Sequence, residues 1–263
     1  MSKKLGLVLG AGGSRGVAHI GVIRALEEEG IKPSLITGCS IGSVVGACYA
    51  KGMTCDEMLE TAYKIKAGNL IDPAAVPIKK LGFFKGDKMH ELLLENIGDI
   101  TFEQLEIPFC CVASDMLSGR SVTLCEGKVT DAVRASSSIP ALFRPVKLDG
   151  KMLIDGGVLC RVPTEQAWEM GAEAVLAIDV LGNTGDSVSS IRNIVSMVFR
   201  IYDMMDYNAT QIKKQLTKRK GELWLTPQIE DMSQYVVKDL DRAYEQGYAI
   251  TRANMSAIKK LIK

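Results

Sequence analysis

A serine enclosed by two glycines, at the end of a short apolar run, limits what this chain can fold into more than any other feature. Residues 35–37 are apolar or β-branched, and Gly38-Cys39-Ser40-Ile41-Gly42 follows. Gly-x-Ser-x-Gly is the pattern of a nucleophile elbow, a strained turn between a strand and a helix whose neighbours must be small. Such a turn would hold the Ser40 hydroxyl above a sheet, beside amides that favour negative charge. A serine that only caps a helix fits these five residues equally well, so other residues must decide.

The elements around this turn predict an α/β fold. Apolar runs bounded by glycine or proline indicate strands, and apolar residues at helical spacing indicate helices between them. The predicted strands are 5–9, 33–38, 108–114, 120–125, 146–148, 151–154 and 174–180. The predicted helices are one between the glycine-rich loop and Gly30, then 41–51, 54–66, 87–96, 129–137 and one from Pro163 to Gly171. Because strands and helices alternate, we expect a mainly parallel central sheet with right-handed crossovers.

Length and composition suit one large domain. The chain has 263 residues, of which 47% are apolar, which is enough for a substantial core. We expect a single domain over residues 1–263, with a loop-rich cap at 67–86 and a mainly helical C-terminal portion at about 188–263. In that portion one apolar stripe recurs at helical spacing, formed by Ile191, Ile194, Val195, Val198, Ile201, Tyr202 and Met205. No apolar stretch approaches the roughly 18 residues that a membrane-spanning helix requires.

Charge and cysteine usage argue against several classes of function. The 32 basic and 31 acidic side chains give a net charge of +1, which provides no basic field for nucleic acid. The seven cysteines are scattered and lack the spacing of a zinc site. We therefore expect a cytoplasmic protein with reduced, mostly buried thiols, with no metal or other cofactor and no nucleic-acid partner. The oligomeric state is left open.

A serine nucleophile needs a base, and the chain offers few histidines for that role. The only two, His19 and His90, lie in predicted helices, whereas an α/β-hydrolase triad places its histidine in a loop late in the chain. The remaining candidate is a carboxylate beside the serine. Asp155 follows a predicted strand and precedes Gly156 and Gly157, which would let another part of the backbone approach closely. An ordinary Asp-Gly-Gly turn is the alternative.

The glycine-rich loop at residues 10–16 supplies a third part of a possible site. Acyl transfer creates an oxyanion, which needs amides preset toward one point. Gly12 and Gly13 can offer such amides, and Arg15 adds a cation. A dinucleotide loop is the rival interpretation, but counting Gly-x-Gly-x-x-Gly from Gly10 places Arg15 at the third glycine. The next strand also lacks the acid that would hold a ribose, so nucleotide binding is disfavoured.

Four pieces of the chain, taken together and in order, resemble the patatin-like phospholipase family in its compact bacterial form. They are Gly12-Gly13-Ser14-Arg15-Gly16 with Ala18 to Val22, the elbow Gly38 to Gly42, the segment Ala135 to Pro145, and Asp155-Gly156-Gly157. The resemblance covers roughly residues 5–180. It implies a three-layer α/β/α fold, a catalytic Ser40-Asp155 dyad, an oxyanion hole at Gly12 and Gly13 assisted by Arg15, and hydrolysis of lipid acyl esters. Ala11 and Cys39 differ from residues common in the family, and neither change removes a catalytic group.

The resulting hypothesis is a serine acyl hydrolase that forms an acyl-Ser40 intermediate and takes a lipid or fatty-acyl ester as its substrate. Acyl transfer to an alcohol or thiol, and a regulator or adaptor with an idle site, remain as alternatives. Residues 76–86 contain Phe83 and Phe84 with Lys79, Lys80 and Lys85, which suits peripheral contact with a lipid surface at the inner face of the membrane. The alternative is a loop whose aromatic side chains are buried in the core.

Overall fold

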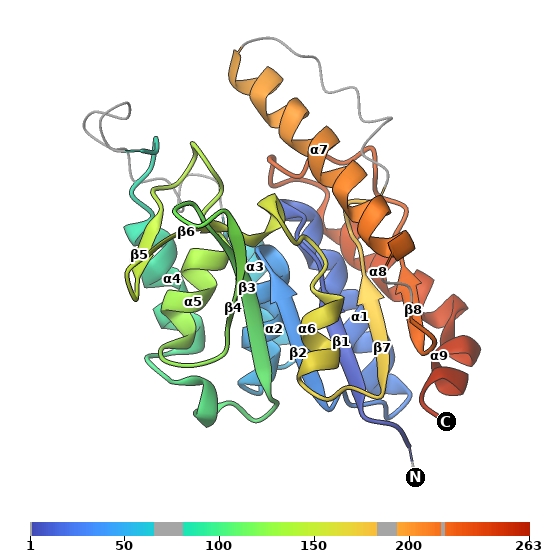
Figure 1. Cartoon of the computed structure of the whole chain (residues 1–263). Coiled ribbons are helices and arrows are strands. Elements are labelled where there is room, and N and C mark those ends of the chain that lie inside the picture. The colour runs from blue at the N-terminus through green and yellow to red at the C-terminus, as the bar shows by residue number, and fades with distance from the viewer. Residues whose placement is uncertain (1, 66–80, 183–193, 217–218) are drawn as a thin grey trace.

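One mixed sheet forms the centre of the protein (Figure 1). The computed structural model describes residues 2–65, 81–182, 194–216 and 219–263, and the sheet in these ranges has eight strands. Its strands are β1 (Leu5–Leu9), β2 (Leu35–Cys39), β3 (Phe109–Asp115), β4 (Arg120–Leu124), β5 (Val146–Leu148), β6 (Lys151–Asp155), β7 (Ala174–Ile178) and β8 (Glu222–Leu225). They lie in the order β5-β6-β3-β2-β1-β7-β8, with β4 also paired to β3. The pairs among β3, β2, β1, β7 and β8 are parallel, which confirms the predicted mainly parallel centre.

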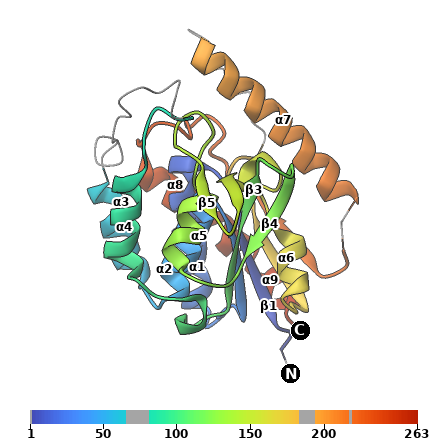
Figure 2. The same cartoon turned by 60° about the vertical axis from the view of Figure 1, so that its left-hand side comes forward.

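Helices cover both faces of this sheet. They are α1 (Val17–Glu28), α2 (Ile41–Ala50), α3 (Cys55–Lys64), α4 (Asp87–Ile97), α5 (Val129–Ser136), α6 (Thr164–Glu169), α7 (Ile194–Leu216), α8 (Leu240–Ala253) and α9 (Met255–Leu261). Successive residues of a strand point to opposite faces. Leu7 of β1 accordingly packs in the large cluster with Val22 and Ala47 of α1 and α2, whereas Val8 packs with Ala167 of α6. Figures 1 and 2 show α6 on the face opposite to α1 and α2, so the predicted α/β architecture with helical layers is confirmed.

The strand β3 brings the ends of β2 and β6 together. Its first half pairs in parallel with β2, up to Cys39 opposite Val112. Its second half pairs in antiparallel fashion with β6, where Asp155 lies opposite Ala113. Because β4 occupies the other edge of β3, β2 and β6 share one edge and meet end to end. The residue after Cys39 therefore lies beside Asp155 without any long loop.

Several local predictions agree with the structure. The predicted Asp-Gly hairpin joins β5 and β6, and Asp149 and Gly150 both have positive φ, at 48° and 74°, as a type I′ turn requires. One difference lies in the C-terminal portion, which holds α7, α8 and α9 as expected but also the strand β8. Pairing with β7 across the sheet creates that strand, and a local apolar pattern of four residues could not predict it. None of the helices in the described ranges combines the length and apolar character needed to cross a bilayer.

The expected cap lies outside the described residues up to position 80. In its described end, the amides of Phe83 and Phe84 donate to the carbonyls of Ala141 and Leu142. The Phe84 ring packs against Phe143, with ring centroids 6.0 Å apart, whereas Phe83 remains 46% exposed. Phe84 therefore fits the interpretation in which the aromatic side chains are buried, and Phe83 fits the one in which they face outward.

Candidate active site

Ser40 occupies the strained turn that its sequence predicts. It lies between β2 and α2 with φ 52° and ψ −125°, a left-handed conformation that a serine rarely adopts. A Cβ at Gly38 would collide with the backbone of Gly42, and a Cβ at Gly42 would collide with the backbone of Leu9. The elbow therefore needs both glycines, because the start of α2 packs directly on the backbone around it.

Ser40 and Asp155 are hydrogen-bonded to each other. The Ser40 hydroxyl donates to Asp155 Oδ2 at 2.6 Å, and the Gly157 amide donates to Asp155 Oδ1 at 2.8 Å. The two side chains are almost fully buried, with exposed fractions of 6% and 3%. The backbone amide thus fixes Oδ1 of the carboxylate, while Oδ2 faces the serine. This geometry joins two residues that are 115 positions apart in sequence.

Burial prepares Asp155 to exchange a proton near neutral pH. Loss of solvent raises the pKa of its carboxyl to about 6, although the bonds from Ser40 and Gly157 act in the opposite direction. The negative charge of Asp206 raises it further. At pH 7 the carboxylate is mostly ionised, and it is a stronger base than an exposed aspartate.

The C-terminal end of α5 and the residues just after it tie Ser40 and Asp155 to one another through a hydroxyl and a backbone carbonyl. Ser136 Oγ accepts the Ser40 amide at 3.0 Å and donates to the Val112 carbonyl at 2.7 Å. Two residues later, the Ser138 carbonyl accepts the Asp155 amide at 2.9 Å. Sequence reasoning used this segment only as a family resemblance and missed the role of Ser136. The run of three serines from Ser136 to Ser138 at the end of a predicted helix was the available signal.

The glycine-rich loop lies against the elbow. A Cβ at Gly16 would collide with the Ile41 side chain, and the Ala11 methyl packs near Gly157. Within the described ranges, the amides of Gly12 and Gly13 have no hydrogen-bond acceptor. Two free donors beside a buried serine are what an oxyanion hole requires.

Arg15 is directed elsewhere than sequence reasoning expected. Its guanidinium is buried and donates to the carbonyls of Met232, Leu181 and Glu230, at 2.8 Å for Met232 from Nε. These hydrogen bonds use Nε and both terminal nitrogens of the guanidinium. They hold the segment before α8 against the glycine-rich loop. The structure therefore gives Arg15 a positioning function in the fold and offers no support for the expected direct assistance to an oxyanion.

Neither histidine is arranged as a base for Ser40. His19 is fully buried, its Nε2 lies 2.8 Å from the Gly10 carbonyl, and burial lowers its pKa to about 4. A neutral imidazole that donates to a carbonyl through Nε2 braces the end of β1. His90 Nε2 lies 3.1 Å from Asp131 on α5 and is partly exposed. Both histidines therefore contact groups other than Ser40.

A buried ion network lies next to the aspartate. The Arg161 guanidinium donates to Asp179 Oδ2 and Asp206 Oδ2, both at 2.8 Å, and all three side chains are buried. Burial raises the pKa of Asp206 to about 6, even though the Arg161 charge lowers it. Sequence reasoning missed this network, whose signal was an arginine within the apolar run after Asp-Gly-Gly.

Tyr202 brings α7 to the dyad. Burial raises the pKa of its phenol, and the charge of Asp155 adds to that effect. A Cβ at Gly157 would meet the Tyr202 hydroxyl, so the glycine makes room for this side chain. The sequence pattern includes Tyr202 in the apolar stripe of the C-terminal portion, but it does not indicate that this side chain lies at the site.

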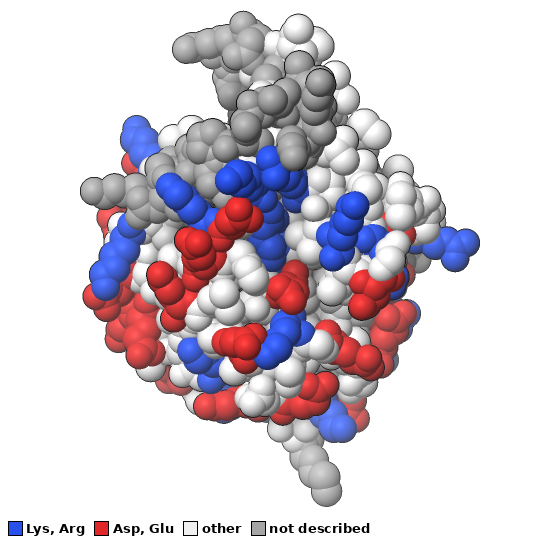
Figure 3. Space-filling model, turned by 90° about the vertical axis from the view of Figure 1, so that its left-hand side faces the viewer, with Lys and Arg blue, Asp and Glu red and all other residues white. Residues whose placement is uncertain are grey.

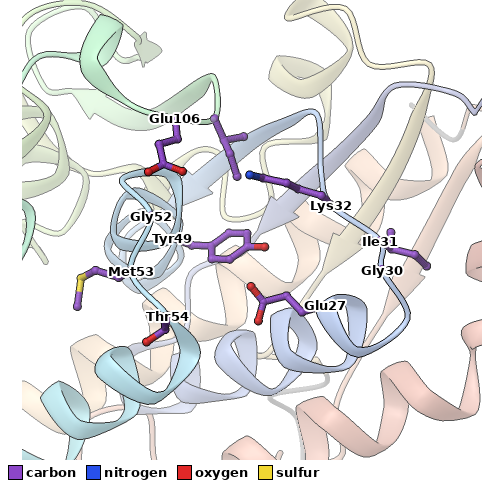
Figure 4. Close-up of a pocket in the computed structure, with 10 residues that line it drawn as sticks. Glu27, Gly30, Ile31, Lys32, Tyr49, Gly52, Met53, Thr54 and Glu106 are labelled. Carbon is purple, nitrogen blue, oxygen red and sulfur yellow. The ribbon is translucent and has the colours of Figure 1, made fainter.

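A depression of about 350 Å³ lies away from this site. Its lining residues come from the C-terminal ends of α1 and α2 and from the segments before β2 and β3. Figure 4 shows Tyr49 and Glu27 pointing toward one another there. These are the amino ends of the strands, opposite to Ser40, and none of the predicted site residues lines the depression. Among the described residues no group of three or more His, Cys, Asp or Glu side chains could hold a metal ion.

Comparison with known sequences gives a consistent result. The family model described as Patatin-like phospholipase matches residues 7–168. An uncharacterized NTE family protein of Mycobacterium tuberculosis is 36% identical over 182 residues, which cover 69% of this chain and 50% of that protein. The lysophospholipase nte1 of Aspergillus fumigatus is 29% identical over 280 residues, which cover 98% of this chain and 18% of that protein. The chain thus spans about half the length of the mycobacterial relative.

Solved structures show the same fold at low identity. VipD from Legionella pneumophila has a TM-score of 0.61 at 12% identity, with 97% of this chain and 67% of that one covered. Human GIVD cytosolic phospholipase A2 has a TM-score of 0.51 at 12% identity, with 99% and 59% covered.

Proposed function

Because the chain belongs to the patatin-like phospholipase family, we propose that it hydrolyses carboxylic esters of lipids with Ser40 as nucleophile and Asp155 as base. One observation carries this proposal: the Ser40 hydroxyl, on a strained elbow, donates to a buried carboxylate 2.6 Å away. A regulator with an idle site would have no need of this strain or of a desolvated carboxylate.

The proposed reaction has two halves. Asp155 accepts the Ser40 proton as Oγ attacks the ester carbonyl, and the same proton passes to the leaving alcohol. An acyl-Ser40 ester remains. Asp155 then takes a proton from water, which attacks the acyl group, and the proton returns to Ser40 as the fatty acid leaves. The Gly157 amide keeps the carboxylate oriented through both halves.

We propose that the oxyanion of each half is held by the amides of Gly12 and Gly13. Their free donors, at the edge where the elbow lies, support this role. A single well-placed donor contributes roughly 3–4 kcal/mol to the transition state. Arg15 contributes by fixing the loop against the segment around Met232.

The substrate class follows the named relatives. Several of them are called lysophospholipases, so a lysophospholipid is the first ester to assay. Transfer of the acyl group to an added alcohol or thiol is the second outcome to measure, since the same intermediate permits it. All seven cysteines are free thiols, and all but Cys125 are buried, which supports a cytoplasmic location.

The test is labelling of the protein with a fluorophosphonate probe, followed by a panel of lysophospholipids and phospholipids. We expect Ser40→Ala and Asp155→Asn each to lower kcat by about a thousandfold or more, with the circular dichroism spectrum unchanged. Ser40→Ala should also abolish labelling. His90→Gln serves as the matched control and should retain turnover. Full activity of Asp155→Asn, or labelling that survives Ser40→Ala, would refute the dyad.

A further inference from the structure

Helix α7 presents its apolar side chains outward and its acidic side chains inward. The exposed large apolar residues recur at helical spacing and are Ile194, Met197, Val198, Ile201, Met204, Met205, Ile212 and Leu216. On the inner side Asp206 and Thr210 are buried, and Asp203 accepts hydrogen bonds from Gln234 and Tyr235. A surface helix ordinarily has the reverse arrangement, with its apolar stripe against the core.

The ion network fixes this orientation. Asp206 is the α7 member of the network, and Arg161 holds it at 2.8 Å in a buried position. A rotation of α7 that turned the apolar stripe toward the protein would separate Asp206 from Arg161 and leave the guanidinium with only Asp179 of its two buried carboxylate partners. Such a loss is expensive. The buried ion network therefore keeps the apolar face of α7 exposed.

The outward face of α7 is also free of charge. Among the α7 residues whose side chains the structure describes, every exposed one is uncharged, since Asn208, Ala209 and Gln215 complete the set. A contiguous apolar patch of this kind is unusual on a protein surface that meets only water. Three of its members are methionines, whose flexible side chains adapt to an irregular partner.

Further exposed apolar residues lie near the carboxyl ends of the strands, the edge of the sheet that carries Ser40. In the described ranges, every other exposed large apolar residue except Tyr63 lies in connections near the same edge of the sheet, namely Leu81, Phe83, Met116, Leu117, Leu159, Tyr235, Val236 and Val237. Met116 and Leu117 follow the carboxyl end of β3, and Gln234 bonds the glycine-rich loop. Figures 1 and 2 show α7 standing clear of the sheet at this edge. Figure 3 shows acidic and basic side chains interspersed over a neighbouring face, with basic ones gathered toward its upper rim, at the end where α7 lies.

We propose that α7 and these connections form the surface by which the protein docks on a lipid bilayer. The apolar side chains would enter the boundary between head groups and acyl chains, with the edge of the sheet that carries Ser40 facing the bilayer. A second copy of this chain is the rival occupant. The bilayer is favoured because the basic rim offers attraction to lipid phosphate that an identical copy would lack. The proposal rests on the proposed function for the choice of a lipid partner.

The test compares two triple variants of α7. Met197→Gln/Ile201→Gln/Met205→Gln removes apolar character from the outward face without adding charge, and Gln is a good helix former. Met197→Leu/Ile201→Leu/Met205→Leu is the matched control. Co-sedimentation with phosphatidylcholine vesicles gives the partition coefficient, light scattering gives the oligomeric state, and the melting temperature checks the fold.

We expect the Gln variant to partition about tenfold less than wild type or lower, and the Leu variant to partition as wild type does. Raising the salt from about 0.1 M to about 1 M should leave most of the binding, because apolar contact is not screened. Equal binding by the Gln variant would overturn the proposal. So would a wild-type dimer that the Gln variant dissociates without a change in vesicle binding. Since binding is measured without turnover, failure of a fluorophosphonate to label Ser40 would refute the proposed function alone.

Discussion

The surroundings of the dyad and helix α7 adjoin one another and are held in opposite ways. Around Ser40, apolar strands and neutral hydrogen bonds position two polar groups: the register on β3 aligns them, and Ser136 and Ser138 hold their backbones. In α7, buried charged groups position an apolar surface, because Arg161 holds Asp206 inward.

The two regions differ in the interaction that determines how their side chains are oriented. Where a sheet is covered on both faces, apolar burial fixes the backbone and polar groups follow it. Where a helix lies on the surface, a buried ion pair can decide which side faces outward. Removing a neutral hydrogen bond costs about 1 kcal/mol, whereas removing one partner of a buried ion pair costs roughly 3–5 kcal/mol. Removing a member of the ion network that attaches α7 should therefore lower the free energy of unfolding more than removing a hydrogen bond around the dyad.

Loss of Arg161 gives the largest expected effect on stability. Arg161→Met leaves Asp179 and Asp206 buried without their cation, and the free energy of unfolding should fall by roughly 3–5 kcal/mol. Urea denaturation measures it. Arg161→Met/Asp206→Asn should recover part of the loss, because one uncompensated charge is gone. A loss below about 1 kcal/mol in the single variant would show that charge does not hold α7.

Arg15 tests whether charge also holds the segment before α8. Arg15→Met strands the carbonyls of Met232, Leu181 and Glu230, so we expect roughly 2–4 kcal/mol of destabilisation. The melting temperature should fall more clearly than kcat per folded molecule. A selective fall in kcat at unchanged stability would contradict this and return Arg15 to the oxyanion hole.

The buried carboxylate of Asp155 should lower stability as the price of function. Its pKa is about 6 in the fold against about 3.8 for the ordinary group, so the folded state binds more protons between these values. Stability from this group is full below pH 3.8 and is lost as the pH rises through 6. Asp155→Asn should therefore raise the free energy of unfolding by roughly 1–3 kcal/mol at pH 8, and by little near pH 4.

Asp115 supplies the control for this pH dependence. The Ser118 hydroxyl and nearby amides lower the pKa of its carboxyl, so its contribution is present above the unfolded value and lost as the pH falls. Asp115→Asn should accordingly destabilise the protein at neutral pH. If both variants shifted stability in the same direction at pH 8, the assigned environment of Asp155 would be wrong.

Ser136 gives the smallest expected effect. Ser136→Ala removes the acceptor of the Ser40 amide and should lower kcat about tenfold, with KM little changed, because the elbow loses one support for its strained turn. The adjacent Ser137→Ala is the control, since the buried Ser137 hydroxyl has no partner in the described ranges. Equal activity of the two variants would show that the sheet register alone holds the dyad.

The sequence by itself determined the local parts of this protein. Glycines around Ser40 leave one tight turn as the economical conformation, and Asp-Gly at 149–150 specifies a hairpin turn. Periodic apolar runs identified most strands and helices, and the set of motifs indicated Ser40 and Asp155 as partners. These features could be predicted because each depends on residues a few positions apart.

Only the tertiary structure decided how distant parts face one another. The apolar stripe of α7 is evident in the sequence, but its outward orientation depends on Arg161, which lies 45 positions from Asp206. Arg15 has its partner Met232 at a separation of 217 positions, so its role could not be deduced from the loop around it. A local pattern specifies that a helix has two faces. Which face meets the protein is decided by the balance of desolvation and ion pairing with residues brought near by the fold.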